Sequence, residues 1–366
     1  MLVTLSTELG FTLVGGGGLE VARSGLIFCT LLSAGFISAH FGKARALGAS
    51  LLLLGAGLAL YGTASSYAGL LLALAFAGVG GGVIEALLNP LVEELHREDS
   101  GRYLNIINGF WSLGVLLTMV LGGEVLTRTG TWRPILFTLA GISLLAGAMF
   151  FLLRHAGPPR ERQAMGDMFA HKREILRDRR FYLFSGMMFF GGAVEGGYTF
   201  WLASYLQLSH GGTARMGGLG TALFALGMMV GRFGFGAHVP QRGLRALVLW
   251  SAGTGIFLGP VVVLAPLGVP LWIALFAAGV ATACFWPTLQ SLAVAQLDLE
   301  ATPLFILLSC GGIAGFTSAS WLMGWLGERV GLAQAFAVVP LFGACLWVLV
   351  YRVTAQDAGR SMSSRA

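Results

Sequence analysis

Two acidic residues, Glu85 and Glu195, stand inside long apolar stretches with no basic residue near them in sequence. A carboxyl group at the depth of a lipid bilayer is costly unless it faces water, an ion or a polar ligand, so such residues mark functional sites by default. We therefore expect both to handle protons or a polar solute inside a membrane. The alternative is structural: a protonated Glu85 bonded to a neighbouring helix, and Glu195 stabilising a kink by bonding freed backbone groups.

Each acid has a polar neighbour on the same helix face. Asn89 follows Glu85 at a spacing of four residues, and Tyr198 follows Glu195 at a spacing of three. Pro90 lacks a backbone N–H and so frees a carbonyl group beside Asn89. The two stretches therefore predict two polar walls in an apolar surrounding.

A third apolar stretch carries a polar stripe. Asn105, Asn108 and Ser112 recur on one helix face, and Trp111 borders that face. Amides donate and accept the hydrogen bonds that hydroxyl groups need, and an aromatic ring covers the apolar face of a sugar. These residue types favour a sugar-like solute, but amides that bond one helix to another would give the same pattern.

A fourth stretch completes the candidate site. Trp286 and Gln290 flank Pro287 and are candidates for the remaining wall, with core packing as the alternative for Trp286. Pro90 and Pro287 interrupt one span in each half of the chain. Broken helices at matching positions point to a substrate site between two repeats.

The composition identifies the solvent around the chain. Hydrophobic residues make up 56% of the 366 residues and charged residues 11%, against roughly 25% charged in soluble domains. In lipid each segment must satisfy its own backbone hydrogen bonds, and runs of about 20 apolar residues suit helices rather than barrel strands. We predict an all-α polytopic membrane protein with two pseudo-symmetric helical bundles and eleven spans, at residues 24–41, 46–64, 68–93, 101–125, 133–154, 180–207, 213–238, 243–265, 269–295, 302–326 and 331–353.

Domain boundaries follow from the breaks in hydropathy. The predicted order is a short segment 1–23, an N-terminal bundle 24–154, a cytoplasmic linker 155–179, a C-terminal bundle 180–353 and a cytoplasmic tail 354–366. The basic linker is interpreted either as an amphipathic helix on the membrane surface or as a solvated connection.

The basic residues predict the orientation. One side of the membrane receives only Arg23, Arg128, Arg133, Arg215 and Arg329, and the other side receives every remaining Lys and Arg. By the positive-inside rule the C-terminus is then cytoplasmic and the N-terminus outside.

Several other classes of function lack support. The net charge of +6 is a topology signal rather than a nucleic-acid surface. The four cysteines and six histidines have no metal-ligand spacing, and there is no P-loop. We therefore expect no metal, no cofactor, no enzymatic activity and no nucleic-acid partner.

Two predicted cytoplasmic turns resemble each other. Each pairs two glycines seven positions apart with nearby basic residues. The candidate gating residues are Gly35, Gly42, Lys43, Arg45, Gly236 and Gly243.

The first of these turns carries a family resemblance. The stretch GFISAHFGKAR, residues 35–45, is similar to the loop between helices 2 and 3 of the major facilitator superfamily. Ala39 and His40 stand where that loop has its acid and arginine, so the resemblance does not extend to the charge-relay latch of better-matching members. The chain resembles this superfamily over almost its whole length.

Within the superfamily, the spans resemble sugar transporters. IEALLNP (residues 84–90) and LNIINGFWSLG (104–114) are similar to stretches of the fucose:proton symporter and its glucose/galactose relatives, and AVEGGYTFWLASYL (193–206) is similar to the seventh helix of sugar-type members. The resemblance implies a proton-coupling role for Glu85 and a sugar cavity that Asn108 faces.

The superfamily has twelve helices, and the segment upstream of residue 24 is expected to be only the tail of helix 1 with its loop. Gly15 to Gly18 should break it, and it falls short of the roughly 17–25 apolar residues of a span. Either the start of the chain lies further upstream or the protein is a remnant of five plus six helices.

Taken together, these features predict a secondary transporter that moves a small polar solute of the sugar class together with protons by alternating access. The expected setting is a bacterial-type inner membrane, and the expected state is a monomer. A drug or metabolite exporter of the same superfamily and a non-transporting membrane sensor are the alternatives.

Overall fold

The computed structural model describes residues 2–96, 99–152, 173–297 and 299–363, and the regular structure in these ranges is entirely helical. Ten described segments are long and apolar enough to cross a membrane. The all-α polytopic fold is confirmed.

The helices fall on either side of residue 153. The first group is α1 (Leu2–Leu9), α2 (Leu13–Phe41), α3 (Lys43–Thr63), α4 (Tyr67–Leu95), α5 (Ser100–Thr129) and α6 (Arg133–Leu152). The second group is α8 (Arg179–Ser209), α9 (Ala214–Val230), the π-helix η2 (Gly231–Gly236), the 3₁₀ turn η3 (Gln241–Gly243), α10 (Leu244–Leu264), α11 (Val269–Thr282), α12 (Phe285–Leu297), α13 (Ala301–Val330), α14 (Leu332–Ala335) and α15 (Val338–Ser363).

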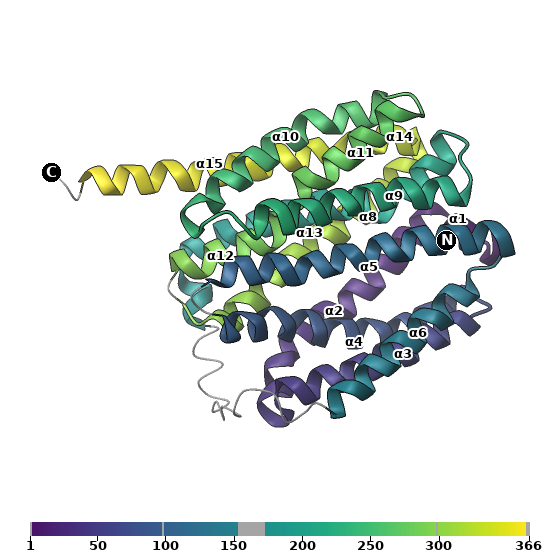
Figure 1. The fold of residues 1–366 in the computed structure, drawn as a ribbon, viewed down its shortest axis with the longest axis horizontal. Coiled ribbons are helices and arrows are strands. Elements are labelled where there is room, and N and C mark those ends of the chain that lie inside the picture. The colour runs from purple at the N-terminus through teal and green to yellow at the C-terminus, as the bar shows by residue number, and fades with distance from the viewer. Residues whose placement is uncertain (1, 97–98, 153–172, 298, 364–366) are drawn as a thin grey trace.

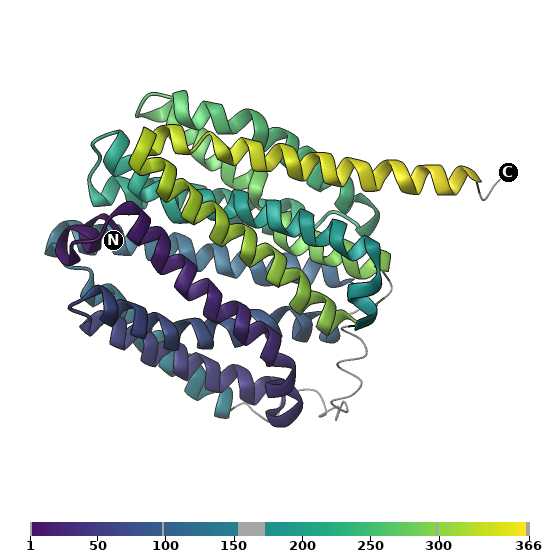
Figure 2. The same cartoon turned by 180° about the vertical axis from the view of Figure 1, so that it is seen from behind.

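The two groups lie side by side as two helical bundles (Figure 1). They meet along two seams, where α5 packs on α9 and α2 packs on α13, and the opposite view shows the second seam (Figure 2). Ile27 and Leu31 of α2 belong to one apolar cluster with Ile306 and Cys310 of α13. The exact domain boundaries stay a prediction.

The first long helix begins earlier than the sequence suggests. The prediction that Gly15 to Gly18 break the chain is wrong, because α2 runs without interruption from Leu13. Thr12 caps its N-terminus by accepting a hydrogen bond from the backbone N–H of Gly15. A Cβ at Gly17 would lie 3.2 Å from the Cα of Trp321 in α13, so these glycines allow two helices to approach closely.

Eleven spans are predicted, but only ten described helices are both long and apolar enough to cross a membrane. The predicted span that is missing from these ten is α8. This helix of 31 residues matches the predicted span 180–207 and is long enough to cross. It is buried along most of its length against α9, α13 and α15, so few of its side chains need to meet lipid. That position allows α8 to carry Glu195 and four glycines close to it.

The expected pair of broken helices is found in one half only. Pro90 lies inside the continuous helix α4, so the prediction of an interruption there is wrong. In the second half, α11 ends at Thr282 and α12 starts at Phe285, which places Pro287 in the first turn of a new helix, where its missing N–H costs nothing.

The first predicted gating turn has the expected backbone. Gly42 joins α2 to α3 with a positive φ of 81°, a conformation that favours glycine. Lys43 forms an ion pair with Glu94 at the end of α4. Gly35 lies inside α2, and Arg45 is exposed.

The second predicted gating turn differs from the first. Gly236 ends the π-helix η2 and Gly243 ends η3, and neither has a positive φ. Most of the predicted linker lies outside the described residues. Its last part, 173–177, is helical, with Ile175 buried and Leu176 exposed.

Glycines set the closest contact between α3 and α4. A Cβ at Gly80 would lie 2.7 Å from the backbone N of Leu54 and 2.7 Å from the carbonyl oxygen of Ser50, both in α3. A Cβ at the adjacent Gly81 would meet nothing within 4 Å. The two positions therefore offer a matched test of this packing.

We expect Gly80→Val to lower the free energy of unfolding by about 1–3 kcal/mol, because the added side chain forces α3 and α4 apart. Gly81→Val makes the same change in helix propensity without the clash and should leave stability close to that of the parent. Thermal unfolding of purified protein in detergent checks this. Equal melting temperatures for the two variants would contradict it.

A polar contact ties α1 to the start of α6. The Glu8 carboxylate accepts a hydrogen bond from the Trp132 indole at 2.7 Å and pairs with the Arg133 guanidinium at 2.8 Å. The indole hydrogen bond, followed by the guanidinium, lowers the pKa of Glu8 below its usual value. A lowered pKa in the folded state means that this contact stabilises the fold at neutral pH and stops doing so as the pH falls through that pKa.

We expect Glu8→Gln to lower the free energy of unfolding at pH 7, and with it the melting temperature. The loss should be at most about 1 kcal/mol, because the ion pair is partly exposed. The difference in melting temperature between Glu8→Gln and the parent should shrink below about pH 4. There the carboxyl group of the unfolded chain takes up its proton first, and the folded state follows at its lower pKa. Melting curves over a pH series measure it, and a difference that does not change with pH would refute the assignment.

Candidate functional site

Glu85 reaches from α4 into the second bundle. Its Oε1 accepts a hydrogen bond from Ser309 Oγ of α13 at 3.3 Å. Ser309 Oγ accepts one from Gln290 Nε2 of α12 at 3.1 Å. Ser309 and Gln290 are both buried. Side chains of two helices in the second bundle therefore hold this acid, rather than the backbone of a helix in its own bundle.

The same chain of hydrogen bonds returns to the first bundle. Asn89 Nδ2 donates to Gln290 Oε1 at 3.1 Å, and Asn108 Nδ2 donates to Asn89 Oδ1 at 3.4 Å. Asn108 Nδ2 also donates to the carbonyl of Leu104 at 2.8 Å. Each donor in this run points toward Glu85, which is the terminal acceptor. The run thus crosses between the bundles at α4–α13 and at α4–α12.

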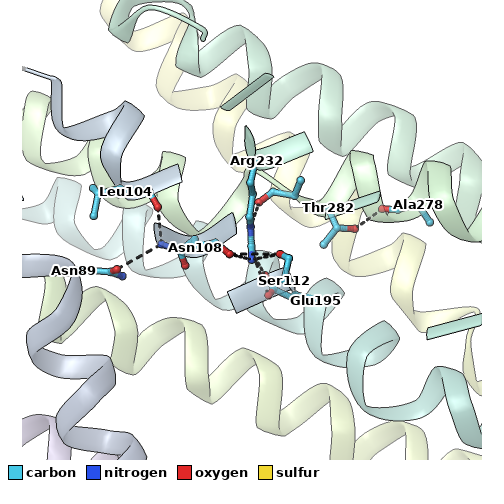
Figure 3. A network of polar contacts seen from close by, with 9 residues as sticks. Asn89, Leu104, Asn108, Ser112, Glu195, Arg232, Ala278 and Thr282 are labelled. Carbon is cyan, nitrogen blue, oxygen red and sulfur yellow. Dashed lines mark hydrogen bonds and ion pairs between the residues drawn. The ribbon is translucent and has the colours of Figure 1, made fainter. Parts of the chain in front are cut away.

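Arg232 occupies the other end of the network (Figure 3). It is 1% exposed. Its Nε donates to the carbonyl of Ala283 at 2.7 Å, and its Nη1 donates to the carbonyl of Asn108 and to Ser112 Oγ, both at 2.9 Å. Its Nη2 contacts both carboxylate oxygens of Glu195 at 3.3 Å. One guanidinium therefore binds α8 and the turn between α11 and α12 in its own bundle, and α5 across the α5–α9 seam.

The π-helix η2 places Arg232 at this point. A π-helical turn inserted after α9 turns side chains away from the positions of an α-helix. Its glycines allow close approach: a Cβ at Gly231 would overlap Ala283, and a Cβ at Gly236 would overlap Asn105. The guanidinium can therefore reach α5 and the gap between α11 and α12 together.

The network contains five of the predicted site residues, Glu85, Asn89, Asn108, Gln290 and Glu195. Trp111 borders it, with the Arg232 guanidinium carbon 5.3 Å from the ring centroid. This indole is 43% exposed and so presents a free aromatic face beside the ion pair.

Three predicted site residues lie outside the network. Tyr198 packs its ring on Phe224, with centroids 5.0 Å apart, in the core of the second bundle. Trp286 packs against Gly312, as expected if it serves core packing rather than solute binding. Asn105 donates to the carbonyl of Gly101 at 2.8 Å, and its Oδ1 has no hydrogen-bond partner among the described residues.

Arg232 is the main residue that the sequence reasoning missed, since it was assigned with the loop cations. The signal was an arginine inside the apolar run of residues 213–238, well separated from Arg215 near the start of that run. Ser309 gave no comparable signal, because a serine in an apolar helix commonly bonds its own backbone.

The sequence also provided no indication of an ion pair at a second buried acid. Glu20 is buried in α2, and it accepts hydrogen bonds from the partly exposed Arg23 at 2.6 Å and from Ser24 at 2.7 Å. Glu20 and Arg23 lie in the segment where no complete helix is expected from the sequence.

The two acids have different surroundings. Glu195 faces a guanidinium that stays charged at all accessible pH values, so loss of its negative charge would leave a buried cation without its partner. Glu85 is bonded by a neutral hydroxyl, so it can gain or lose a proton without breaking an ion pair. Glu85 is thus bonded to a neutral group and Glu195 to a charged one.

Metal ligands were not expected. Within the described residues, no three His, Cys, Asp or Glu side chains come together in a way that could hold a metal ion.

Comparison with known proteins gives consistent matches. A family model described as Major Facilitator Superfamily matches residues 1–316. The membrane protein MosC of Rhizobium meliloti is 26% identical over 344 residues, which cover 92% of this chain and 79% of MosC. The E. coli fucose:proton symporter FucP has a similar structure, with a TM-score of 0.67, 18% identity and coverage of 96% of this chain and 95% of FucP. The human organic anion transporter MFSD10 aligns with a TM-score of 0.72, 17% identity and coverage of 92% and 83%.

We expect Arg232→Met to lower the free energy of unfolding by about 3–5 kcal/mol, because it leaves Glu195 as an unpaired buried charge. The double variant Arg232→Met with Glu195→Met removes both charges and should recover most of that loss. A double-mutant cycle of melting temperatures in detergent measures the coupling. Additive losses in the double variant would show that the pair is not coupled.

Proposed function

Because the chain belongs to the Major Facilitator Superfamily, we propose that it works as a secondary transporter that moves a small polar solute together with protons. The solute site is proposed to lie between the two bundles, and the bundles rock about it so that it opens to each side of the membrane in turn. The observation that carries this proposal is the polar network that joins Glu85 to Glu195 across both bundles.

The network supplies a way to couple a proton to the motion. Rocking the bundles requires breaking hydrogen bonds that cross between them, among them Ser309 to Glu85 and Asn89 to Gln290. A hydrogen bond to an ionised carboxylate is stronger than one to a neutral carboxyl group. Protonation of Glu85 therefore weakens the contact between α4 and α13 and favours separation of the bundles at this point.

The residue types around the network support a sugar-class solute. Once the bundles separate, the amides of Asn89 and Gln290 lose each other as partners and can bond hydroxyl groups instead, beside the Asn108 amide. The exposed face of Trp111 can cover the apolar face of a sugar ring. FucP, whose name gives fucose and protons as its cargo, has the same fold, which is consistent with this choice.

The placement in the cell is part of the proposal. We infer a multi-pass protein of a bacterial-type inner membrane, acting as a monomer, with α15 leading to a cytoplasmic C-terminus. The distribution of Lys and Arg supports this orientation.

We expect Glu85→Gln to abolish proton-driven accumulation of solute, because an amide cannot carry a proton, while exchange of solute across the membrane continues. Glu174→Gln, at an exposed acid next to α8, is the matched control and should transport like the parent. Proteoliposomes with an imposed pH gradient measure accumulation, and counterflow measures exchange, with a panel of labelled sugars and sugar acids. Unchanged accumulation by Glu85→Gln would remove Glu85 from the mechanism.

A further inference from the structure

We propose that Arg232 binds a carboxylate of the transported solute, and that the solute is a sugar acid with one negative charge. In this view the Glu195 carboxylate pairs with Arg232 when solute is absent. When Glu195 takes up a proton, it releases Arg232 to the carboxylate of the solute. The inference rests on the proposed transport function and specifies its substrate class.

The guanidinium is held in place without Glu195. Its bonds to the carbonyls of Ala283 and Asn108 and to Ser112 Oγ are 2.7–2.9 Å long. Its two contacts with Glu195 are both 3.3 Å, longer than typical charge-assisted bonds of about 2.7–2.9 Å. Three neutral partners thus fix the guanidinium, and the charged partner makes its longest contacts. Such a geometry allows the carboxylate of a solute to replace that of Glu195 at the Nη2 edge of the guanidinium.

Charge balance requires a replacement. Arginine stays protonated in proteins, and Arg232 is nearly fully buried. When Glu195 takes up a proton, the site carries one uncompensated positive charge. The other titratable groups of the site are Glu85 of α4, which a run of hydrogen bonds links to Asn108, and the Cys284 thiol, which donates to the carbonyl of Gly231. Neither makes a hydrogen bond to the guanidinium among the described contacts.

The surroundings define the rest of the ligand. One guanidinium balances one negative charge and matches the planar fork of a carboxylate. A neutral sugar would leave the cation unbalanced, and a dianion would add an excess negative charge. Next to the guanidinium are the Asn108 amide and the exposed ring of Trp111, which suit hydroxyl groups and the apolar side of a sugar ring. A singly charged uronic acid combines these features.

The test uses matched ligand pairs that differ only at one carbon: galactose with galacturonate, glucose with glucuronate, and mannose with mannuronate. Ligand-induced shifts in melting temperature measure binding by the purified protein, and counterflow in proteoliposomes measures exchange. We expect at least one acidic sugar to bind and exchange, with its neutral partner inactive. Glu195→Gln, which frees the guanidinium, should bind that acid more tightly than the parent does.

The double variant Arg232→Met with Glu195→Met removes the proposed anion site while avoiding an unpaired charge, and it should lose binding of the acid. Arg177→Gln, at an exposed arginine, is the control and should bind like the parent. If a neutral sugar exchanges as well as its acidic partner, or if the double variant binds the acid like the parent, the inference is overturned while proton-coupled transport stands. If no sugar or sugar acid exchanges, the proposed function falls with it.

Discussion

A buried guanidinium in a lipid-facing protein must be both neutralised and fully hydrogen-bonded, and this constraint at Arg232 organises the centre of the molecule. Water cannot satisfy its donors at this depth, so backbone carbonyls and side chains must do so. The structure meets the requirement with Asn108 and Ser112 of α5, Glu195 of α8 and Ala283 in the turn between α11 and α12. Satisfying one side chain therefore fixes the positions of α5, α8 and the break between α11 and α12 relative to η2.

Close backbone contact makes this arrangement possible. Helices in lipid associate through packing rather than through the hydrophobic effect, and small residues allow their backbones to approach. Gly17 serves this purpose between the bundles, Gly80 within the first bundle, and Gly236 beside Asn105. The glycines that look like breaks in a hydropathy profile are thus contact points. The same property lets two bundles share a seam and still separate, because a glycine contact has few interlocking side chains to disengage.

The two acids in the apolar stretches divide the chemistry between them. Glu195 is matched by a permanent cation, and Glu85 is matched by a hydroxyl at the end of a run of neutral donors. Burial alone would have made the two equivalent. Their difference comes from one serine and one arginine contributed by helices that lie far away in sequence, α13 and η2.

The sequence alone determined the solvent, the helical class and the identity of the acids, because hydropathy and the rarity of charge in apolar runs are local properties. It also indicated Asn89, Asn108 and Gln290, since polar residues at helical spacing reveal a helix face. It failed at Gly15 to Gly18 and at Pro90, where local propensity suggested a break and packing keeps the helix continuous. Only the tertiary structure joined Arg232 to Glu195 and Ser309 to Glu85. Those pairings depend on which helix faces meet across the two bundles, and no spacing along the chain records that.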